Sequence, residues 1–292
     1  MIINKSFFGT KTIPHIEIDE DTIKELANKS IEKKQTVTGV QKKLSLNFDK
    51  DNMDRLTLVD YPVGYILKPQ ADEYPALPES EDLVMDIANA AGIKTVPHGL
   101  IEYDGKWAYI TKRIDRKKDI KYAMEDFCQL SGRLTEDKYK GSYEKCVEVI
   151  SQYSSRKVID KTEFFLVILI SFITGNSDMH LKNFSLIETK PGNREYVLSP
   201  AYDLLPVNVV DTNDKEELAL PLNGKKTKIR RKDFLALAEK CEIEIEVAEK
   251  IINNISKRLP KFIEMTEQSE MPDELKERFI ELMKERTERI SE

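Results

Sequence analysis

The sequence predicts an α+β protein of two lobes, in which strands dominate the first third of the 292 residues and helices the remainder. Three observations carry this prediction. Polar and apolar residues alternate over 43–48, an Asp104-Gly105 turn signal separates two apolar runs, and apolar residues recur at helical spacing after residue 115. We place the first lobe at residues 1–113 and the second at residues 114–292, with a cleft between them.

The first lobe contains several short segments with strand patterns. Lys43–Phe48 has the period of two that a half-buried strand shows. Tyr65–Leu67 is an apolar run that Pro69 should end, because proline cannot donate a hydrogen bond to a sheet. Leu100–Tyr103 and Trp107–Ile110 flank the Asp-Gly dipeptide, which favours a two-residue hairpin turn. These segments together predict a small sheet.

Helical patterns begin in the first lobe and dominate the second. Residues 83–91 repeat apolar side chains at helical spacing, and the glycine that follows can cap the helix. Residues 143–153 and 164–174 have the same spacing, and Asp160 with Glu163 could form a capping box for the second of these helices. The remaining helical segments lie at residues 234–235, 243–259 and 274–283.

The composition restricts the kinds of function. The net charge of −6 gives no bulk electrostatic reason to bind nucleic acid directly, and we expect no such binding. Three cysteines and three histidines are too few and scattered for a disulfide framework or a zinc site, which favours a hard cation held by oxygens. The longest apolar run, Phe164–Thr174, is shorter than the roughly 20 residues that span a bilayer, and the N-terminus has no secretory apolar segment. We expect a cytoplasmic protein without a membrane partner.

One segment carries most of the chemical information: Gly175-Asn176-Ser177-Asp178-Met179-His180-Leu181-Lys182-Asn183. Asp178 and Asn183 have the spacing of the acid and amide in protein-kinase catalytic loops, where the Asp accepts a hydroxyl proton and the Asn holds magnesium. Asp203 follows where a second metal-binding Asp should stand. Asp178 would be the base, and Asn183 and Asp203 would bind Mg²⁺. The alternative is a polar loop after a buried helix, in which Asp178 only helps to turn the chain.

Lys68 ends the apolar strand pattern Ile66-Leu67-Lys68-Pro69. A lysine in this place can hold the α- and β-phosphates of ATP, but it can equally be an edge-strand lysine that prevents aggregation. Glu81, at the start of the next helix, could pair with Lys68 or could simply complement the helix dipole. His180 and Lys182 could contact phosphate, or could be a structural hydrogen-bonding group and a solvated lysine.

The segment Thr36–Lys43 is a weak candidate for a phosphate loop. It contains one glycine, Gly39, so neither the dinucleotide-binding motif nor the Walker motif is present. A single glycine can still permit a turn whose backbone amides face phosphate, and Lys42 and Lys43 add positive charge. The alternative is the ordinary start of a hairpin.

Six motifs together resemble those of HipA-like serine/threonine kinases, the toxin halves of bacterial toxin–antitoxin systems. They occur in the family's order over roughly residues 30 to 290: Thr38-Gly39-Val40-Gln41-Lys42-Lys43, Ile66-Leu67-Lys68-Pro69, Arg113-Ile114-Asp115-Arg116, Glu125-Asp126-Phe127-Cys128-Gln129, the 175–183 segment, and Ala201-Tyr202-Asp203. The fourth and fifth motifs are together the most specific. The resemblance implies a two-lobed protein-kinase-like fold that uses ATP and Mg²⁺.

The resemblance also implies roles for individual residues. Asp178 would be the catalytic residue, and Lys68 would bind the ATP phosphates. The phosphates would be covered by Thr38, Gly39, Val40, Gln41, Lys42 and Lys43. The hinge that meets adenine through backbone groups would be Lys112, Arg113 and Ile114, with Asp115 near the ribose. The phosphate and magnesium site would be lined by His180, Leu181, Lys182, Asn183, Tyr202 and Asp203. Autophosphorylation would fall on Thr36 or Thr38, in a loop where the family carries serine.

The resemblance further implies partners. By this resemblance we expect the protein to be without the N-terminal subdomain of longer HipA proteins, as in the short HipT-type toxins. A protein substrate is implied, which in relatives is an aminoacyl-tRNA synthetase, together with antitoxin subunits of which one binds DNA. The basic run Lys225–Lys232 is either a solvated loop or a surface for nucleic acid or an acidic partner.

Two other functions stay open at this point. Lys112 and Ile114 replace the usual glutamate and phenylalanine of the hinge, which motivates a catalytically idle pseudokinase that binds nucleotide or antitoxin. A small-molecule kinase is the other alternative, because the catalytic loop also resembles those of aminoglycoside and lipid kinases. The Glu125–Gln129 motif favours the HipA-like interpretation over this one.

Overall fold

The computed structural model describes residues 3, 5–17, 43–48, 55–58, 64–117 and 120–292. Contacts within the chain divide it into two compact units. The first unit comprises residues 1–82 and 96–119, and the second comprises residues 83–95 and 120–292. The main sheet belongs to the first unit and most helices belong to the second. The single lobe boundary after residue 113 stays a prediction.

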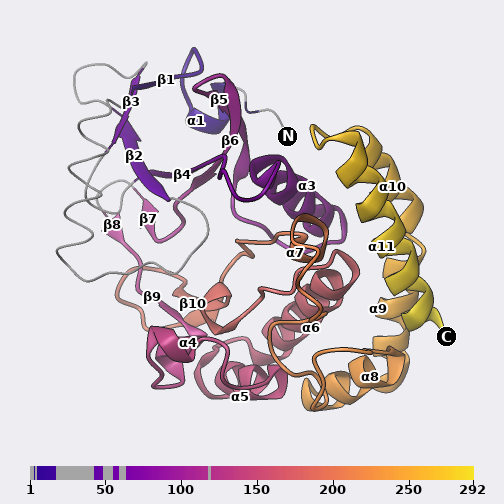
Figure 1. The fold of residues 1–292 in the computed structure, drawn as a ribbon. Helices are drawn as coiled ribbons and strands as arrows, with labels where there is room; N and C mark the ends of the chain where they lie inside the picture. The colour runs from indigo at the N-terminus through magenta and orange to yellow at the C-terminus, as the bar shows by residue number, and fades with distance from the viewer. Residues whose placement is uncertain (1–2, 4, 18–42, 49–54, 59–63, 118–119) are drawn as a thin grey trace. The chain divides into compact units, whose positions relative to one another are not determined.

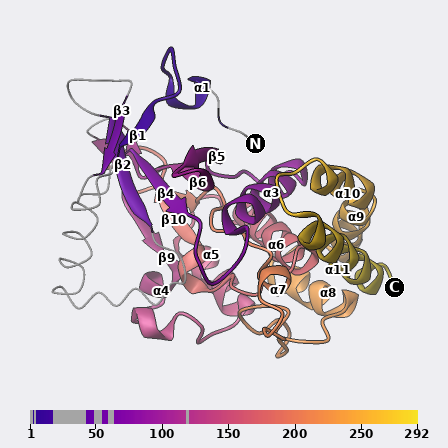
Figure 2. The same ribbon diagram turned by 45° about the horizontal axis from the view of Figure 1, so that its top comes forward.

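A six-stranded sheet forms the first unit, and its strands can be followed in Figure 2. The strands are β1 (His15–Glu17), β2 (Leu44–Phe48), β3 (Arg55–Leu58), β4 (Tyr65–Pro69), β5 (His98–Tyr103) and β6 (Lys106–Lys112). Their order in the sheet is β1-β3-β2-β4-β6-β5. All neighbours are antiparallel except β1 and β3. The short strand β7 (Arg116–Lys117) follows in the chain.

The strands predicted from the sequence are confirmed with small changes at their ends. The hairpin of β5 and β6 turns at Asp104 and Gly105, whose φ angles of +50° and +70° are those of a type I′ turn. Strand β4 includes Pro69 as its last residue, where the missing amide proton costs least.

Aromatic rings pack around Tyr65 of β4 to form part of the sheet's core. The short helix α1 (Lys5–Phe8) contributes Phe7 and Phe8, whose ring centroids lie 5.8 and 5.3 Å from that of Tyr65. Phe48 of β2 lies 5.9 Å from the same ring in an edge-on arrangement. Aromatic pairs of this kind contribute about 0.5–1.5 kcal/mol each beyond the burial of their area, so they fix the position of β4.

Helix α3 (Leu77–Ala90) begins in the first unit and continues in the second. Its apolar face includes Val84, Ile87 and Ala88, which are fully buried. The predicted segment 83–91 is therefore helical, and the helix begins six residues earlier than its apolar pattern. Gly92 has a φ of +99° and its amide donates to Asn89 O at 2.9 Å, which confirms its role as a C-terminal cap.

The second unit is mainly helical. Its longer helices are α5 (Tyr143–Tyr153), α6 (Lys157–Ile173), α8 (Arg231–Lys240), α9 (Ile245–Ser256), α10 (Leu259–Glu267) and α11 (Asp273–Ser291). Short helices are α4 (Phe127–Leu130), α7 (Val207–Val210), η1 (Thr135–Asp137) and η2 (Leu181–Asn183). Strands β9 (Met124–Asp126), β10 (Ser185–Glu188) and β11 (Tyr196–Leu198) form a sheet in the order β11-β10-β9, and β8 (Ile120–Lys121) precedes it. Helix α11 packs on α6, α7, α9 and α10 (Figure 1), which confirms the predicted helical tail.

The predicted capping box at Asp160 is wrong. Helix α6 begins at Lys157, so Asp160 lies inside its first turn and is fully buried. The Asp160 carboxylate accepts hydrogen bonds from Leu198 N at 2.7 Å and Ser154 Oγ at 2.6 Å, and it pairs with Arg156 Nε at 2.7 Å. Asp160 therefore joins α6 to β11 instead of capping the helix. No helix within the described ranges is long and apolar enough to cross a membrane.

The basic run 225–232 is largely neutralised by acidic partners within the second unit. Lys225 pairs with the buried Asp233 at 2.7 Å, and Lys226 pairs with Glu216 at 2.9 Å. Other ion pairs join Arg230 to Glu292 and Arg231 to Glu249. These pairs favour the interpretation of the run as a structural loop leading into α8.

Candidate functional site

The 175–183 segment is a tight loop between α6 and β10, and both of its ends are anchored in the core. Gly175 has a φ of +75°, and a Cβ there would come within 3.2 Å of a leucine of α11. At the other end the ring of Phe184 lies 4.9 Å from that of Phe164 in α6 and 5.6 Å from that of Phe127 in α4. The polar residues between these anchors are therefore held in place by packed neighbours.

Asp178 lies near the middle of this loop with its side chain 47% exposed. Its amide donates to Asn176 Oδ1 at 3.2 Å, which fixes the turn. Its carboxylate oxygen Oδ1 accepts a hydrogen bond from the Tyr139 hydroxyl at 2.5 Å. The same oxygen lies 3.9 Å from His180 Nε2. The carboxylate is thus oriented on one side and open to solvent on the other.

Asn183 is buried and lies in η2, directly after the loop's turn. Its amide nitrogen Nδ2 donates to the backbone oxygen of Asp178 at 2.9 Å. The structure thus brings together the two residues that the sequence singled out by their spacing. Because the amide nitrogen donates to the backbone of Asp178, the amide oxygen Oδ1 is the atom with which Asn183 could bind a cation.

His180 is buried between Asp178 and η2. Its Nδ1 accepts a hydrogen bond from Lys182 N at 3.3 Å, so in the neutral ring the proton lies on Nε2, on the side of Asp178. Burial lowers the pKa of His180, and the nearby charge of Asp178 opposes this only in part. His180 is therefore a neutral hydrogen-bonding group at pH 7.

Lys182 and Tyr202 hold the segment that follows the loop. Lys182 Nζ pairs with Asp126 Oδ2 at 2.7 Å. The Tyr202 hydroxyl donates to Lys182 O at 3.1 Å and lies 2.5 Å from Ser185 Oγ, which can donate to it in turn. Leu181 is buried between these residues. Lys182 is thus an ion-paired side chain instead of a freely solvated one.

Asp203 has a φ of +62°, in the left-handed region that residues other than glycine rarely adopt. Its side chain is half-buried, and its negative charge opposes in small part the lowering of the His180 pKa by burial. Backbone strain of this kind collects at functional sites, where the surrounding structure enforces it. The carboxylate of Asp203 and the amide oxygen of Asn183 are hard oxygen donors of the type that Mg²⁺ prefers.

Four residues, here called the loop brace, connect the 175–183 loop to α11: Ser177, Asn208, Asp214 and Arg286. Ser177 Oγ donates to Asp214 Oδ2 at 2.5 Å. Asn208 Nδ2 donates to Ser177 Oγ at 3.3 Å and to Glu216 O at 2.9 Å. Buried Arg286 donates to Asn208 Oδ1 at 2.7 Å and to the backbone oxygen of α6 residue 172 at 2.6 Å.

Lys68 lies in the first unit and is buried. Its Nζ donates to Glu81 Oε1 at 2.6 Å, and both side chains are at most 5% exposed. The ammonium also lies 5.3 Å from the centre of the Tyr109 ring. The predicted pair of a strand lysine with a helix glutamate is therefore confirmed, and the alternatives of an exposed edge lysine and a helix-dipole glutamate are not.

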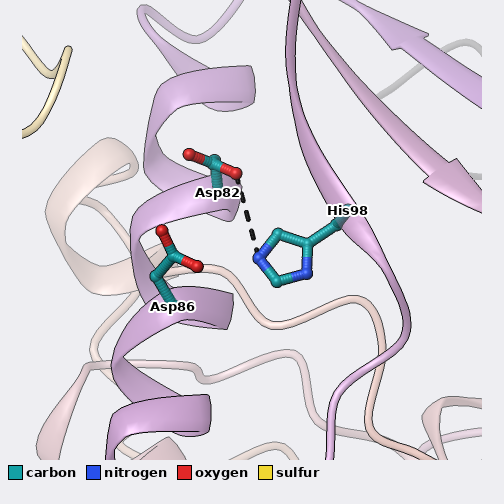
Figure 3. A group of neighbouring side chains, drawn as sticks. All are labelled: Asp82, Asp86 and His98. Atoms are coloured by element: carbon teal, nitrogen blue, oxygen red, sulfur yellow. Dashed lines mark ion pairs between the residues drawn. The ribbon is translucent and has the colours of Figure 1, made fainter. Parts of the chain in front are cut away.

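The polar surroundings of Lys68 extend through Tyr109 to His98. The His98 ring stacks on that of Tyr109 at 5.8 Å, and its Nδ1 lies 2.8 Å from Val96 O. Its Nε2 lies 3.8 Å from Asp82 Oδ1, the pair that the dashed line in Figure 3 marks. Asp86 follows one turn later on the same helix (Figure 3). Asp82, Asp86 and His98 were not singled out from the sequence.

The predicted hinge residues lie at the end of β6. The amides of Lys112 and Arg113 donate to Pro97 O and Gly64 O, both at 2.9 Å. Asp115 accepts from Arg113 Nε at 2.9 Å and from both Arg113 and Arg116 at 2.8 Å. Ile114 is half-buried. Any adenine contact made by the backbone of this segment would therefore use groups other than the first two amides.

The predicted phosphate loop lies mostly outside the described residues. This applies to Thr36, Thr38, Gly39, Val40, Gln41 and Lys42. Lys43 is described, and it is exposed immediately before β2.

The sequence analysis missed Tyr139 and named Asp126 only within the Glu125–Gln129 motif, without a role. Tyr139 contacts Asp178 from 39 positions away, and no local pattern points to this contact. Asp126 caps α4 through a capping box with Gln129 and also pairs with Lys182. The Asp-x-x-Gln spacing of this cap is readable from the sequence, but its partner at position 182 is not.

The fold is a two-lobed, protein-kinase-like α+β fold, as the sequence resemblance implied. The structure is similar to a chain of the Shewanella oneidensis toxin–antitoxin complex of HipA, HipB and operator DNA, with a TM-score of 0.75 and 19% identity over 91% of this chain and 70% of that one. It is also similar to the Helicobacter pylori proinflammatory kinase CtkA, with a TM-score of 0.56 and 19% identity over 85% of this chain and 93% of that one. At these identities the likeness concerns the fold.

The chain belongs to the family of HipA-like C-terminal domains, whose model matches residues 35–263. A Haemophilus influenzae protein named "Putative kinase" is 32% identical over an alignment 203 positions long that covers 64% of this chain and 57% of that protein. A Sinorhizobium fredii protein named "Putative kinase Y4dM" is 32% identical over an alignment 225 positions long that covers 71% of this chain and 54% of that protein. The matches thus span a little over half the length of these relatives.

Proposed function

We propose that this chain is an ATP- and magnesium-dependent serine/threonine protein kinase. The observation that carries the proposal is the hydrogen bond from Asn183 Nδ2 to Asp178 O, because it fixes a candidate base and a candidate metal ligand on one loop. The buried pair of Lys68 and Glu81 supports it, since kinases use such a pair to hold the ATP phosphates. The names of the two relatives support phosphate transfer as the reaction class.

The residues have distinct tasks in the proposed reaction. Asp178 would orient the target hydroxyl and accept its proton as the hydroxyl oxygen forms a bond to the γ-phosphorus and the bond to ADP breaks. Lys68 would hold the α- and β-phosphates. Asn183 and Asp203 would hold Mg²⁺, which supplies positive charge to neutralise the transferred phosphate. The proton would then pass from Asp178, half-exposed as it is, to solvent.

The family also suggests partners and regulation. The Shewanella oneidensis complex contains HipB and operator DNA, which supports an antitoxin partner for this chain with DNA binding on the antitoxin side. The substrate would be a protein, with an aminoacyl-tRNA synthetase as the first candidate. Autophosphorylation at Thr36 or Thr38 would inactivate the kinase, and the chain would act in the cytoplasm.

The test is incubation with labelled ATP and Mg²⁺, using wild type, Asp178→Asn and, as a surface control, Glu148→Gln, whose carboxylate is 65% exposed. Wild type and the control should label themselves or a lysate protein. Asp178→Asn should lose labelling by a factor of about 100 or more at an unchanged unfolding temperature, because positioned acid–base groups contribute about 10²–10⁴ in rate. Mass spectrometry of wild type checks Thr36 and Thr38.

Each contrary outcome has a defined meaning. Full labelling by Asp178→Asn would contradict its role as the base. Nucleotide binding without transfer to any acceptor would support the idle pseudokinase. Transfer confined to a small molecule in the lysate would support a small-molecule kinase.

A further inference from the structure

Tyr139 makes the shortest polar contact with the proposed base. It lies between η1 and α5, and its hydroxyl donates to Asp178 Oδ1 at 2.5 Å. This distance is in the range of about 2.5–2.7 Å that is usual for a hydroxyl donating to a charged carboxylate. Such bonds are about twice as strong as those between neutral groups, so the contact strongly restricts the carboxylate.

The Tyr139 side chain is itself held from several sides. Leu181 N donates to Lys138 O at 3.1 Å, which ties the tyrosine's segment to the 175–183 loop. The tyrosine ring packs edge-on against the His180 ring with centroids 5.0 Å apart. Lys138 Nζ lies 4.9 Å from the centre of the Tyr139 ring. The Tyr139 side chain is 45% exposed, so these contacts and not deep burial direct its hydroxyl to Asp178.

The Tyr139 hydroxyl donates to Asp178 Oδ1, and the His180 ring lies near this oxygen but beyond hydrogen-bond distance. Burial and the hydrogen bond to Asp178 raise the pKa of Tyr139 above its usual value, so the hydroxyl keeps its proton at physiological pH. His180 Nε2 lies 3.9 Å from Oδ1 as well. No side chain or backbone amide in the described ranges donates to the other oxygen, Oδ2, of the half-exposed Asp178.

We propose that Tyr139 is a positioning residue of the kinase reaction, which holds Asp178 by Oδ1 so that Oδ2 receives the proton of the substrate hydroxyl. The proposal rests on the kinase function proposed above. Without the tyrosine hydroxyl, a half-exposed carboxylate can rotate away from the orientation that the reaction requires.

Tyr139→Phe tests this inference, because phenylalanine keeps the ring packing on His180 and removes only the hydroxyl. We expect kcat to fall about tenfold with the KM for ATP unchanged, since one hydrogen bond to a charged group is lost. A crystal structure of the variant should show the Asp178 carboxylate in more than one orientation.

Two matched tyrosines serve as controls. The Tyr143 hydroxyl donates to Met179 O at 3.1 Å, in the same loop but away from the carboxylate. Tyr143→Phe should therefore lower the unfolding temperature without changing the orientation of the Asp178 carboxylate. Tyr153, 40% exposed at the end of α5, should change neither property when replaced by phenylalanine.

Three outcomes would overturn the inference. The first is a Tyr139→Phe variant with the kcat of wild type. The second is a rise in kcat, which would show that Tyr139 occupies the place of the substrate hydroxyl. The third is a single, unchanged Asp178 orientation in the variant crystal structure, a result that holds even if wild type proves inactive. Inactive wild type would contradict the kinase function itself.

Discussion

The loop brace makes a quantitative prediction for Asn208→Ala. The substitution removes the acceptor of Arg286 Nη2 at 2.7 Å and the donor to Glu216 O at 2.9 Å. A lost hydrogen bond to a charged group costs about 1.5–3 kcal/mol and a neutral one about 1 kcal/mol, so we expect a loss of about 3 kcal/mol in the free energy of unfolding. For a chain of this size that corresponds to a fall of roughly 6–12 °C in the unfolding temperature.

Urea unfolding followed by circular dichroism measures this change, with Asn208→Asp as the matched variant. Aspartate keeps an oxygen facing Arg286 but cannot donate to Glu216 O. Its loss should therefore be smaller, about 1 kcal/mol. Differential scanning calorimetry of the same proteins gives the unfolding temperatures.

Two results would refute the reasoning. A loss below about 1 kcal/mol in Asn208→Ala would show that other groups satisfy Arg286 when Asn208 is removed. An equal loss in the alanine and aspartate variants would show that the bond to Arg286 carries none of the stability.

Two further predictions concern buried carboxylates of the second unit. Asp160→Ala removes the acceptor of Leu198 N and the partner of Arg156, and should lower the free energy of unfolding in urea by about 3–5 kcal/mol. Asp160→Asn should lower it by less. Equal losses in the two variants would contradict a role for the charge. Burial alone would raise the pKa of Asp233, but hydrogen bonds from Lys225 and Asn223 outweigh it and hold the pKa below its usual value. The stabilisation is therefore present above about pH 4 and lost as the pH falls through the lowered pKa, so Asp233→Asn should cost about 2 kcal/mol at pH 7 and clearly less at pH 3; a pH-independent cost would contradict it.

Local patterns in the sequence were sufficient for much of the fold. The alternation over residues 43–48 and the Asp104-Gly105 turn are determined by neighbouring residues, and both correspond to structural elements. The start of α6 could not be predicted from neighbouring residues. Asp160 has the spacing of a cap, but its carboxylate is needed by the amide of Leu198, which is close only in the folded chain. Tertiary contacts decided this helix boundary.

The same distinction between local and distant contacts applies to the candidate site. The spacing of Asp178 and Asn183 lies within one loop, and the structure joins the two residues by a hydrogen bond. The pairing of Lys68 with Glu81 also follows from adjacent elements, a strand and the helix after it. Tyr139 and Arg286 act on the loop from distant parts of the chain, and neither stands in a recognisable motif. Such contacts can be recognised only in the folded structure.

The position of Arg286 in α11 has a consequence for incomplete chains. Ribosomes make the 175–183 loop long before the helix whose arginine supports it, and domains fold in the order of their synthesis. A nascent or prematurely terminated polypeptide that stops ahead of α11 would contain every proposed catalytic side chain but an unsupported loop. Any activity of the loop would therefore depend on a helix that is synthesised after it.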